Sequence, residues 1–362
     1  MSNEFRELLK HVGSGSHTSR ALTRAEAEAA TAMMLTQTAT PAQIGAFMIA
    51  HRIKRPTAEE LAGILDAYQG LGPTLPAIVS NSSGGDRSAL VLSCPYDGRS
   101  RTAPVTPVTA LVLAAAGVPV VLHGGDRMPT KAGVPLVELW RQLGVDLTTH
   151  TLEQAHTLLN RTGLGFVYLP QHFPAAHGLV PYRDQIGKRP PLATAELMWS
   201  PYAGSHTLVM GFVHPPTEIF AQATLGLREQ LNWISVKGLE GSCDLARGRT
   251  AIVGVSHGGV FERLLLHPRD YGFDGDDVAL GEEASLGDRL LEVLAGRSSE
   301  LQKTALWNAG FCLWQGGAAA SLEEGLVKAE KLLTTGKAMD KLETLRQQAA
   351  ELNKPSAIAI RV

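Results

Sequence analysis

Short apolar, β-prone runs alternate with helix-like segments from about residue 76 onward. The runs are ALVLSC (89–94), VPVVLHG (118–124), GFVYLP (165–170), HTLVMGF (206–212), NWISVKG (232–238) and RTAIVGV (249–255). Segments such as TPVTALVLAAAG and PLVELWRQLG lie between several of them. Because a parallel strand pair needs a long crossover, which is usually a helix, this alternation favours parallel pairing. It predicts an α/β domain over residues 76–362 with a mostly parallel sheet covered by helices.

The first 75 residues carry a different pattern, in which a threonine is followed three residues later by an acid or an amide. The pairs are Thr23 and Glu26, Thr40 and Gln43, and Thr57 and Glu60. Each pair is a capping box, and apolar residues at helical spacing follow each one. We predict a small all-helical domain over residues 1–75. Residues 172–200 have little β character and are expected to add helices to it.

Composition limits the class of protein. A chain of 362 residues is longer than one usual core, which favours two packed units. Its 33 basic and 35 acidic residues give a net charge of −2, which does not point to a nucleic-acid partner. The three cysteines form no close pair, and no run reaches the roughly 18 apolar residues of a membrane span. We expect a cytoplasmic protein with reduced thiols and no membrane contact.

Two small-residue loops precede the second predicted strand. That strand ends Leu122-His123-Gly124-Gly125-Asp126, and CPYDGRSRT (94–102) and SNSSGGDRS (80–88) lie upstream of it. The strand end resembles the Lys-His-Gly-Asn motif of the anthranilate phosphoribosyltransferase family, which shares its fold with pyrimidine and thymidine phosphorylases. The family's phosphate loop, Gly-Thr-Gly-Gly-Asp, falls in register on residues 95–99. We interpret the upstream loop as a turn.

The resemblance implies a helical domain and an α/β domain, with phosphoribosyl pyrophosphate, magnesium and anthranilate in the cleft between them. Residues implied at the donor phosphates are Asp97, Gly98, Arg99, Arg101, Thr106, His123, Gly124 and Lys131. Proline and tyrosine replace small residues in the loop, so we expect Arg99 and Arg101 to bind phosphate through their side chains. Alternatively the loop is a surface turn with solvated arginines, and Lys131 is a solvated loop lysine.

The acceptor and metal residues follow from two further matches. Arg183 falls on the family's arginine that holds the anthranilate carboxylate, which implies an aromatic acid acceptor; the alternative is an ion pair with a neighbouring acid such as Asp184. The family's magnesium-linked Asp-Glu pair becomes Cys243 and Asp244. Because magnesium prefers oxygen ligands, Asp244 aided by Glu240 is expected to form a weakened Mg²⁺ site.

The resemblance implies transfer of a phosphoribosyl group from phosphoribosyl pyrophosphate to an aromatic acid, as in tryptophan biosynthesis, with a degenerate donor site. No catalytic nucleophile is identified, so we expect catalysis by positioning and charge stabilisation. A homodimer formed through the helical domain is also implied.

Two alternative functions stay open. The segment YDGRSRTAPVTP resembles the divergent YbiB-like branch of the family, whose members are associated with nucleic-acid binding rather than catalysis. Such binding would require the fold to gather a set of basic residues around one cleft: Arg99, Arg101, Arg127, Lys131, Arg183, Lys188 and Arg189. The second alternative is a nucleoside phosphorylase.

Overall fold

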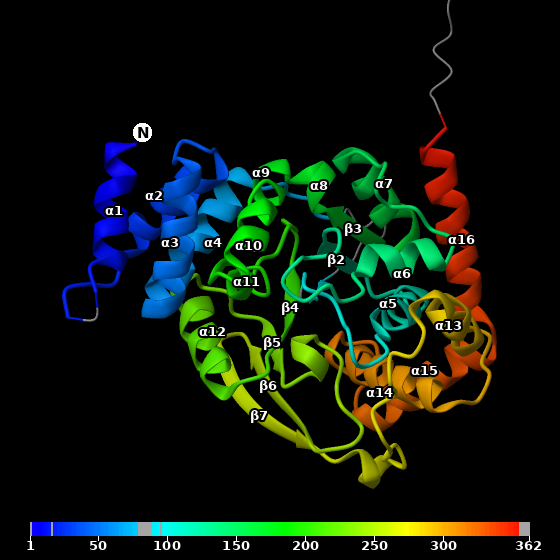
Figure 1. Ribbon diagram of the computed structural model, residues 1–362. Coiled ribbons are helices and arrows are strands. Elements are labelled where there is room, and N and C mark those ends of the chain that lie inside the picture. The colour runs from blue at the N-terminus through cyan, green and yellow to red at the C-terminus, as the bar shows by residue number, and fades with distance from the viewer. Residues whose placement is uncertain (1, 16, 79–87, 95, 355–362) are drawn as a thin grey trace, which may run out of the picture.

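The computed structural model describes residues 2–15, 17–78, 88–94 and 96–354. The interpretation of SNSSGGDRS as a turn falls almost wholly on residues 79–87, and Pro95 is the substituted proline of the phosphate loop; both lie outside the described residues. A helical bundle lies on one side of a seven-stranded sheet, and the C-terminal helices lie on the other (Figure 1).

The N-terminal bundle contains four helices within the described ranges. They are α1 (Asn3–Gly13), α2 (Arg24–Leu35), α3 (Pro41–Lys54) and α4 (Ala58–Leu71). Thr23, Thr40 and Thr57 each form the predicted capping box, with both hydrogen bonds present. Two later helices pack onto the bundle, α10 (Val180–Ile186) against α3 and α11 (Leu192–Ala195) against α4.

The sheet has the strand order β3-β2-β1-β4-β5-β6-β7. Its strands are β1 (Ala89–Ser93), β2 (Val120–Gly124), β3 (Leu164–Tyr168), β4 (His206–Gly211), β5 (Trp233–Val236), β6 (Ala251–His257) and β7 (Val260–Leu266). The first five strands in this order pair in parallel, and β6 and β7 add an antiparallel edge. The predicted class, a helical domain plus an α/β domain with a mostly parallel sheet, is confirmed.

Strand β7 is absent from the six strands predicted above. Gly258 and Gly259, with φ of 56° and 84°, form the tight turn between β6 and β7. Two adjacent glycines between β-prone runs are a hairpin signal, because both central residues of such a turn need positive φ. The two glycines therefore indicate a strand after β6, whereas the run VFERLLL alone does not.

Helices cover both faces of the sheet. Those on or beside the α/β domain are α5 (Thr106–Ala115), α6 (Leu136–Gln142), α7 (Leu152–Thr162), α8 (Leu169–His172), α9 (Pro174–His177), α12 (Pro215–Leu227), α13 (Leu286–Leu294), α14 (Glu300–Gln315), α15 (Leu322–Thr334) and α16 (Lys337–Leu352). Short 3₁₀ turns are η1 (Leu239–Gly241), η2 (Pro268–Tyr271) and η3 (Glu283–Ser285). Among the described residues, no helix is long and apolar enough to cross a membrane.

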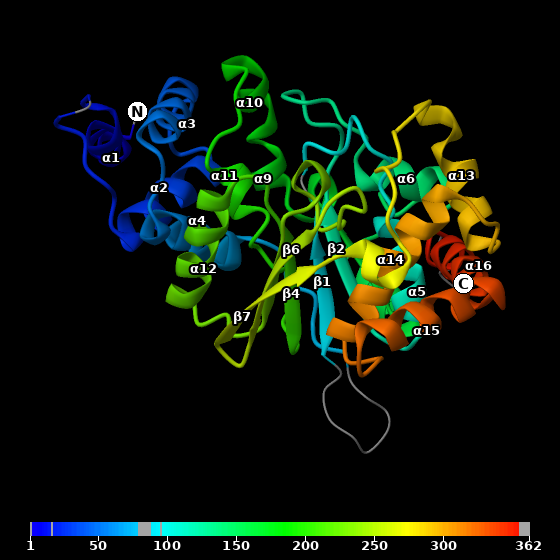
Figure 2. The same cartoon turned by 90° about the horizontal axis from the view of Figure 1, so that it is seen from below.

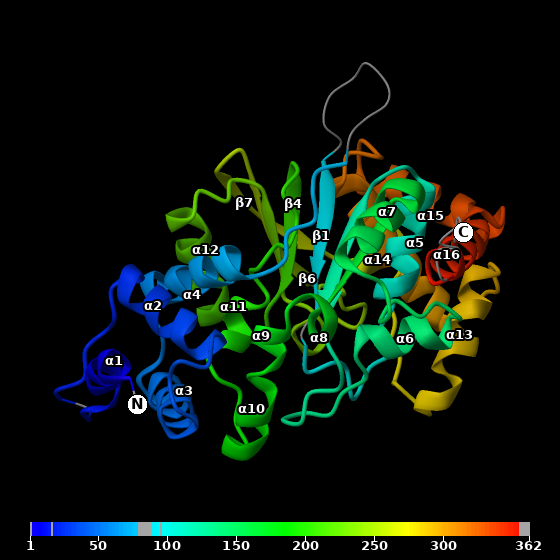
Figure 3. The same ribbon diagram turned by 90° about the horizontal axis from the view of Figure 1, so that it is seen from above.

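Two hydrophobic cores meet at the central strand β1. Leu90 and Leu92 face the core that contains α5 and α14, whereas Ala89 and Val91 face the core shared with the bundle. This division follows from the alternation of side chains along a strand. All five residues of β1 are buried, and views from below and above show helices on either side of it (Figures 2 and 3). The bundle and the sheet therefore share one of the two hydrophobic cores.

The strand order places a ligand site at a known position in such sheets. After β1 the chain builds β2 and β3 on one side, and then β4 and β5 on the other. In open α/β sheets, ligands bind at the carboxyl ends of the strands where the order reverses in this way. Here that point lies between β1 and β4.

Candidate functional site

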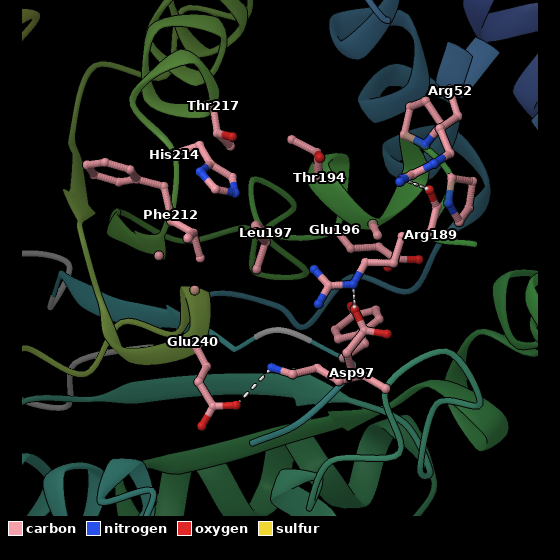
Figure 4. A pocket seen from close by; sticks show the side chains of 18 of the residues that line it. Arg52, Asp97, Arg189, Thr194, Glu196, Leu197, Phe212, His214, Thr217 and Glu240 are labelled. Atoms are coloured by element: carbon pink, nitrogen blue, oxygen red, sulfur yellow. Dashed lines mark hydrogen bonds and ion pairs between the residues drawn. The ribbon is translucent and has the colours of Figure 1, made fainter. Parts of the chain in front are cut away.

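A cleft of about 450 Å³ opens at this point of the sheet. Its walls come from both units: the bundle contributes Arg52 and Pro56, and the segment around α11 contributes residues 189–191, 193–194 and 196–197. The α/β domain contributes loops after four strands, with Asp97 after β1, Lys131 after β2, Phe212 after β4 and Glu240 after β5. Figure 4 shows Arg189 and Asp97 joined across the cleft, with Glu240 on the opposite wall.

The structure divides the predicted site residues into two groups. Asp97, Arg101, Lys131 and Glu240 line the cleft. The others lie outside its lining: Gly98, Arg99, Thr106, His123, Gly124, Arg183 and Asp244. The second group therefore does not face the cleft in this structure.

Asp97 and Gly98 fix the loop after β1 onto the loop after β2. The Asp97 carboxylate accepts a hydrogen bond from Thr130 Oγ1 at 2.6 Å and pairs with Arg189 Nε at 2.6 Å. Gly98 has φ +69°, and a Cβ there would lie 2.5 Å from the carbonyl group of Gly133. Glycine is needed because the two backbones run in contact at this point. Gly98 thus serves the packing of these two loops.

Arg99 lies beneath the loop and is only 3 % exposed. Its Nη1 donates to Asp244 Oδ2 at 2.8 Å and to Ser242 Oγ at 2.9 Å, and its Nε donates to Thr102 Oγ1 at 3.1 Å. The same Nε lies 3.5 Å from Glu240 Oε1. The guanidinium therefore sits between two carboxylates and is not a solvated loop arginine. In contrast, the side chain of Arg101 is 77 % exposed.

Glu240 enters the loop from the opposite wall. Its carboxylate accepts backbone N–H hydrogen bonds from Ser100 at 3.1 Å, Arg101 at 3.0 Å and Thr102 at 3.0 Å. Lys131 Nζ lies 3.0 Å from the same carboxylate. Burial alone raises its pKa, but the hydrogen bonds from Lys131 and the loop hold the pKa of Glu240 well below its usual range. Glu240 is an anion held by the backbone of residues 100–102, in the loop after β1.

Asp244 and Glu240 do not fit the expected magnesium site. Besides Arg99, Asp244 accepts the Val105 N–H at 3.1 Å and the Thr106 hydroxyl at 3.0 Å, so it is bound to the start of helix α5. Mg²⁺ needs accessible carboxylate oxygens in near-octahedral geometry, and here the Arg99 guanidinium separates the two acids. Within the described ranges, no group of three or more His, Cys, Asp or Glu residues could hold a metal ion. Thr106 is likewise engaged with Asp244 rather than with the cleft.

His123 lies at the end of β2 in an aromatic cluster behind the cleft, next to Gly124, the last residue of that strand. Tyr96 Oη is 2.6 Å from its Nδ1, and the Trp199 ring packs edge-on with 5.1 Å between ring centroids. Complete burial lowers the pKa of His123 to about 3, so the ring is neutral. A neutral, fully buried imidazole cannot supply charge to a phosphate; it holds Tyr96, which does line the cleft.

Arg183 is 3 % exposed and pairs with Glu196 through both terminal nitrogens. Tyr68 Oη donates to the same carboxylate at 3.1 Å. The ion pair joins α10 to the segment after α11, and Tyr68 ties both to α4. The partner is thus Glu196, thirteen residues on, and not the neighbouring Asp184 suggested above. An acceptor carboxylate would have to compete with Glu196 for Arg183.

The basic cluster proposed from sequence forms only in part. Arg101, Lys131 and Arg189 line the cleft, whereas Arg127 pairs with Glu138 and Glu283. Several lining residues carry no sequence signal that marks them as functional: Arg52, Thr194, Leu197, Phe212, His214 and Thr217. They reach the cleft because the bundle, α11 and α12 pack together, which is a tertiary effect. Arg189 could be found from the same segment match that selects Arg183.

A helical bundle, an α/β sheet and a cleft between them define a two-unit protein of the enzyme class with a site of small-molecule size, lined by four basic and three acidic side chains. Family comparisons agree with this class. Residues 6–72 match the helical bundle domain of the glycosyl transferase family, and residues 97–339 match its a/b domain. The chain belongs to this glycosyl transferase family, which comprises enzymes and includes the anthranilate phosphoribosyltransferases.

The sequence similarity to individual anthranilate phosphoribosyltransferases extends over most of the chain. An anthranilate phosphoribosyltransferase of Chromobacterium violaceum is 30% identical over 310 residues, which cover 84% of this chain and 87% of the relative. One of Afipia carboxidovorans is 28% identical and covers 95% of this chain and 98% of the relative.

Solved structures share the fold at lower identity. Anthranilate phosphoribosyltransferase of Saccharomyces cerevisiae in complex with phosphoribosyl pyrophosphate and Mg has a TM-score of 0.80 at 16% identity, covering 96% of this chain and 98% of that one. The Thermus thermophilus enzyme has a TM-score of 0.76 at 20% identity, covering 96% and 100%.

Proposed function

We propose that this protein binds phosphoribosyl pyrophosphate in the cleft and transfers its phosphoribosyl group to an aromatic acid. The observation that carries the proposal is the convergence of four basic side chains, Arg52, Arg101, Lys131 and Arg189, on one cleft at the switch point of the sheet. An anionic donor suits such a lining, and the relatives named above use this donor class. The cleft volume of about 450 Å³ lies within the usual range for small-molecule sites.

Phosphoribosyl transfer requires the protein to stabilise charge more than to supply a nucleophile. The bond between the ribose anomeric carbon and pyrophosphate breaks, the acceptor nitrogen bonds to that carbon, and the acceptor releases a proton. Pyrophosphate leaves with the bonding electrons. Arg101 and Lys131 are placed to stabilise that developing negative charge, because both side chains border the cleft from loops on the α/β domain.

The donor site is rebuilt relative to the family pattern. We propose that Arg99 supplies a fixed positive charge between Asp244 and Glu240, where the family uses magnesium-linked acids. Asp244 in turn holds the start of α5 and positions the loop. Donor binding in this chain then relies on side-chain cations, without a metal ion on these two acids.

For the acceptor, Arg189 is the direct candidate. It lines the cleft, and its side chain is 46 % exposed. Arg183 stays a predicted acceptor residue only if Glu196 releases it. Otherwise Arg183 acts through Glu196, which forms part of the cleft wall.

Product formation tests the proposal. The purified protein is incubated with phosphoribosyl pyrophosphate and anthranilate, and pyrophosphate release and the mass of the phosphoribosyl adduct are measured. Both products are expected, and both should fall strongly in an Arg101→Ala, Lys131→Ala double variant. Adduct formation at equal rates in the double variant would contradict the assigned roles. Inorganic phosphate with nucleosides, run in parallel, tests the phosphorylase alternative.

The YbiB-like alternative is nucleic-acid binding without transfer. The observation that favours it is Arg101, which lines the cleft and has a largely exposed side chain. Binding of single-stranded DNA with a steep decrease at higher salt, and no adduct in the transfer assay, would support this alternative. Assembly as a homodimer through the bundle stays a prediction, which native mass spectrometry tests.

A further inference from the structure

Three consecutive backbone amides of the loop after β1 point at one carboxylate. Glu240 Oε2 accepts the Ser100 N–H, and Oε1 accepts the N–H groups of Arg101 and Thr102. The Ser100 and Thr102 hydroxyls donate to the same two oxygens, at 3.2 and 2.8 Å. Successive N–H groups that converge in this way form an anion-binding nest, the arrangement that cradles phosphates in other folds.

The nest is strongly cationic without its occupant. Lys131 Nζ lies 3.0 Å from Glu240 Oε2, Arg101 Nε lies 3.7 Å from it, and Arg99 Nε lies 3.5 Å from Oε1. Five donated hydrogen bonds and three cations on one carboxylate exceed what one buried glutamate needs for satisfaction. They match the larger number of acceptor oxygens on a phosphate group.

The backbone around Glu240 is held by hydrogen bonds, and only the Glu240 side chain extends into the nest. Leu239 N–H donates to the Asp244 carbonyl at 2.9 Å, and Ser242 N–H donates to the Leu239 carbonyl at 3.0 Å. A Cβ at Gly238 would lie 1.8 Å from the Ser242 carbonyl oxygen, so this segment is tightly packed. Glu240 nevertheless borders the cleft. Rotation of its side chain, without movement of the loop, is the direct way to vacate the nest.

We infer that the amides of residues 100–102 with Lys131 form a site for one phosphate group, and that Glu240 is its internal occupant, displaced when a phosphate or pyrophosphate binds. The inference rests on the proposed function, since it places one phosphate of the donor or of the released pyrophosphate. Glu240 competes with the ligand, so the native chain binds pyrophosphate more weakly than the empty nest would.

The test measures binding of inorganic pyrophosphate by isothermal titration calorimetry, in a buffer with a metal chelator. The samples are the native protein and the Glu240→Gln and Glu240→Ala variants. Both variants remove the competing charge, so pyrophosphate affinity is expected to rise roughly tenfold or more, the equivalent of one charge-assisted hydrogen bond. Adding Lys131→Ala to Glu240→Gln should remove this gain. Asp97→Asn is the matched control, because it removes a negative charge from the same cleft without emptying the nest.

Each other outcome has a distinct meaning. Equal pyrophosphate affinity in native protein and both Glu240 variants overturns the inference, and so does a gain in Asp97→Asn as large as in Glu240→Gln. Phosphoribosyl pyrophosphate is titrated in parallel: if the native protein binds it while the Glu240 variants show no gain, only the inference fails. If no form binds either ligand, the proposed function fails as well. Thermal unfolding with and without pyrophosphate identifies variants that do not fold.

Discussion

Arg99 Nη1 donates to Asp244 Oδ2 at 2.8 Å, and the two side chains are each about 4 % exposed. This buried ion pair joins the loop after β1 to the segment after β5, 145 residues apart. Because Asp244 also binds Val105 and Thr106 at the start of α5, one carboxylate sets the position of the loop after β1 relative to the helix that follows it. The candidate site depends on this contact although neither residue lines the cleft.

Replacing Arg99 should therefore destabilise the whole fold. Arg99→Met leaves the Asp244 carboxylate buried with one partner fewer, and breaking a buried pair in this way costs about 3 to 5 kcal/mol. The free energy of unfolding from urea denaturation measures the loss. Arg101→Met is the matched control: its side chain is 77 % exposed, so its unfolding free energy should change by about 0.5 kcal/mol or less. Equal effects of the two substitutions would contradict the assigned contact.

His123 should make stability fall in acid. Its pKa is about 3 in the folded protein against an ordinary value of 6.5. Between these values the unfolded chain binds a proton that the folded chain does not, so stability is complete above about pH 6.5 and declines as the pH falls toward 3. The slope is about 1.4 kcal/mol per pH unit. Unfolding free energies measured across this range in native protein and His123→Gln isolate this contribution; parallel curves would show that His123 plays no part.

Divalent metal ions should not bind at Asp244 and Glu240 in the ligand-free protein. With Asp244 and Glu240 neutralised by Arg99 and Lys131, the described site leaves no carboxylate pair for a divalent ion. Electron paramagnetic resonance of Mn²⁺ is expected to show no site on the ligand-free protein. A stoichiometric Mn²⁺ site that is lost in Asp244→Asn would contradict this account.

Arg189 and Arg183 should differ in the kind of defect they cause. Arg189→Ala is expected to raise the acceptor KM with little change in unfolding free energy, because Arg189 is half-exposed and lines the cleft. Arg183→Met leaves Glu196 buried without its partner and should lower the unfolding free energy by about 3 to 5 kcal/mol. If Arg183→Met instead folds with native stability and shows a raised acceptor KM, Arg183 contacts the acceptor directly.

The sequence predicts the fold more fully than the site, for a physical reason. Helix caps such as Thr23 with Glu26 and the apolar runs of β1 to β6 are local patterns, so they can be read from neighbouring residues. The alignment with the family's motif also places residues 97–101 correctly, in the loop at the carboxyl end of β1. What each side chain does there depends on partners far away in sequence.

Arg99 shows this limit most clearly. From the loop sequence it is either a phosphate ligand or a solvated surface residue, and the structure makes it neither, because Asp244 and Glu240 arrive from the loop after β5. Arg183 is similar, since its partner Glu196 becomes a neighbour only once α10 and α11 pack on the bundle. Arg101 and Lys131 keep the predicted cleft position because they carry long side chains on loops at its mouth.

The most direct test of the account is a calorimetric titration of phosphoribosyl pyrophosphate into the native protein in chelator, alongside the Arg101→Ala, Lys131→Ala double variant. The account predicts saturable binding of the donor without magnesium, and loss of that binding in the double variant. Absence of heat at millimolar donor, or binding that the double variant retains in full, would contradict the assignment of this cleft to a phosphoribosyl donor.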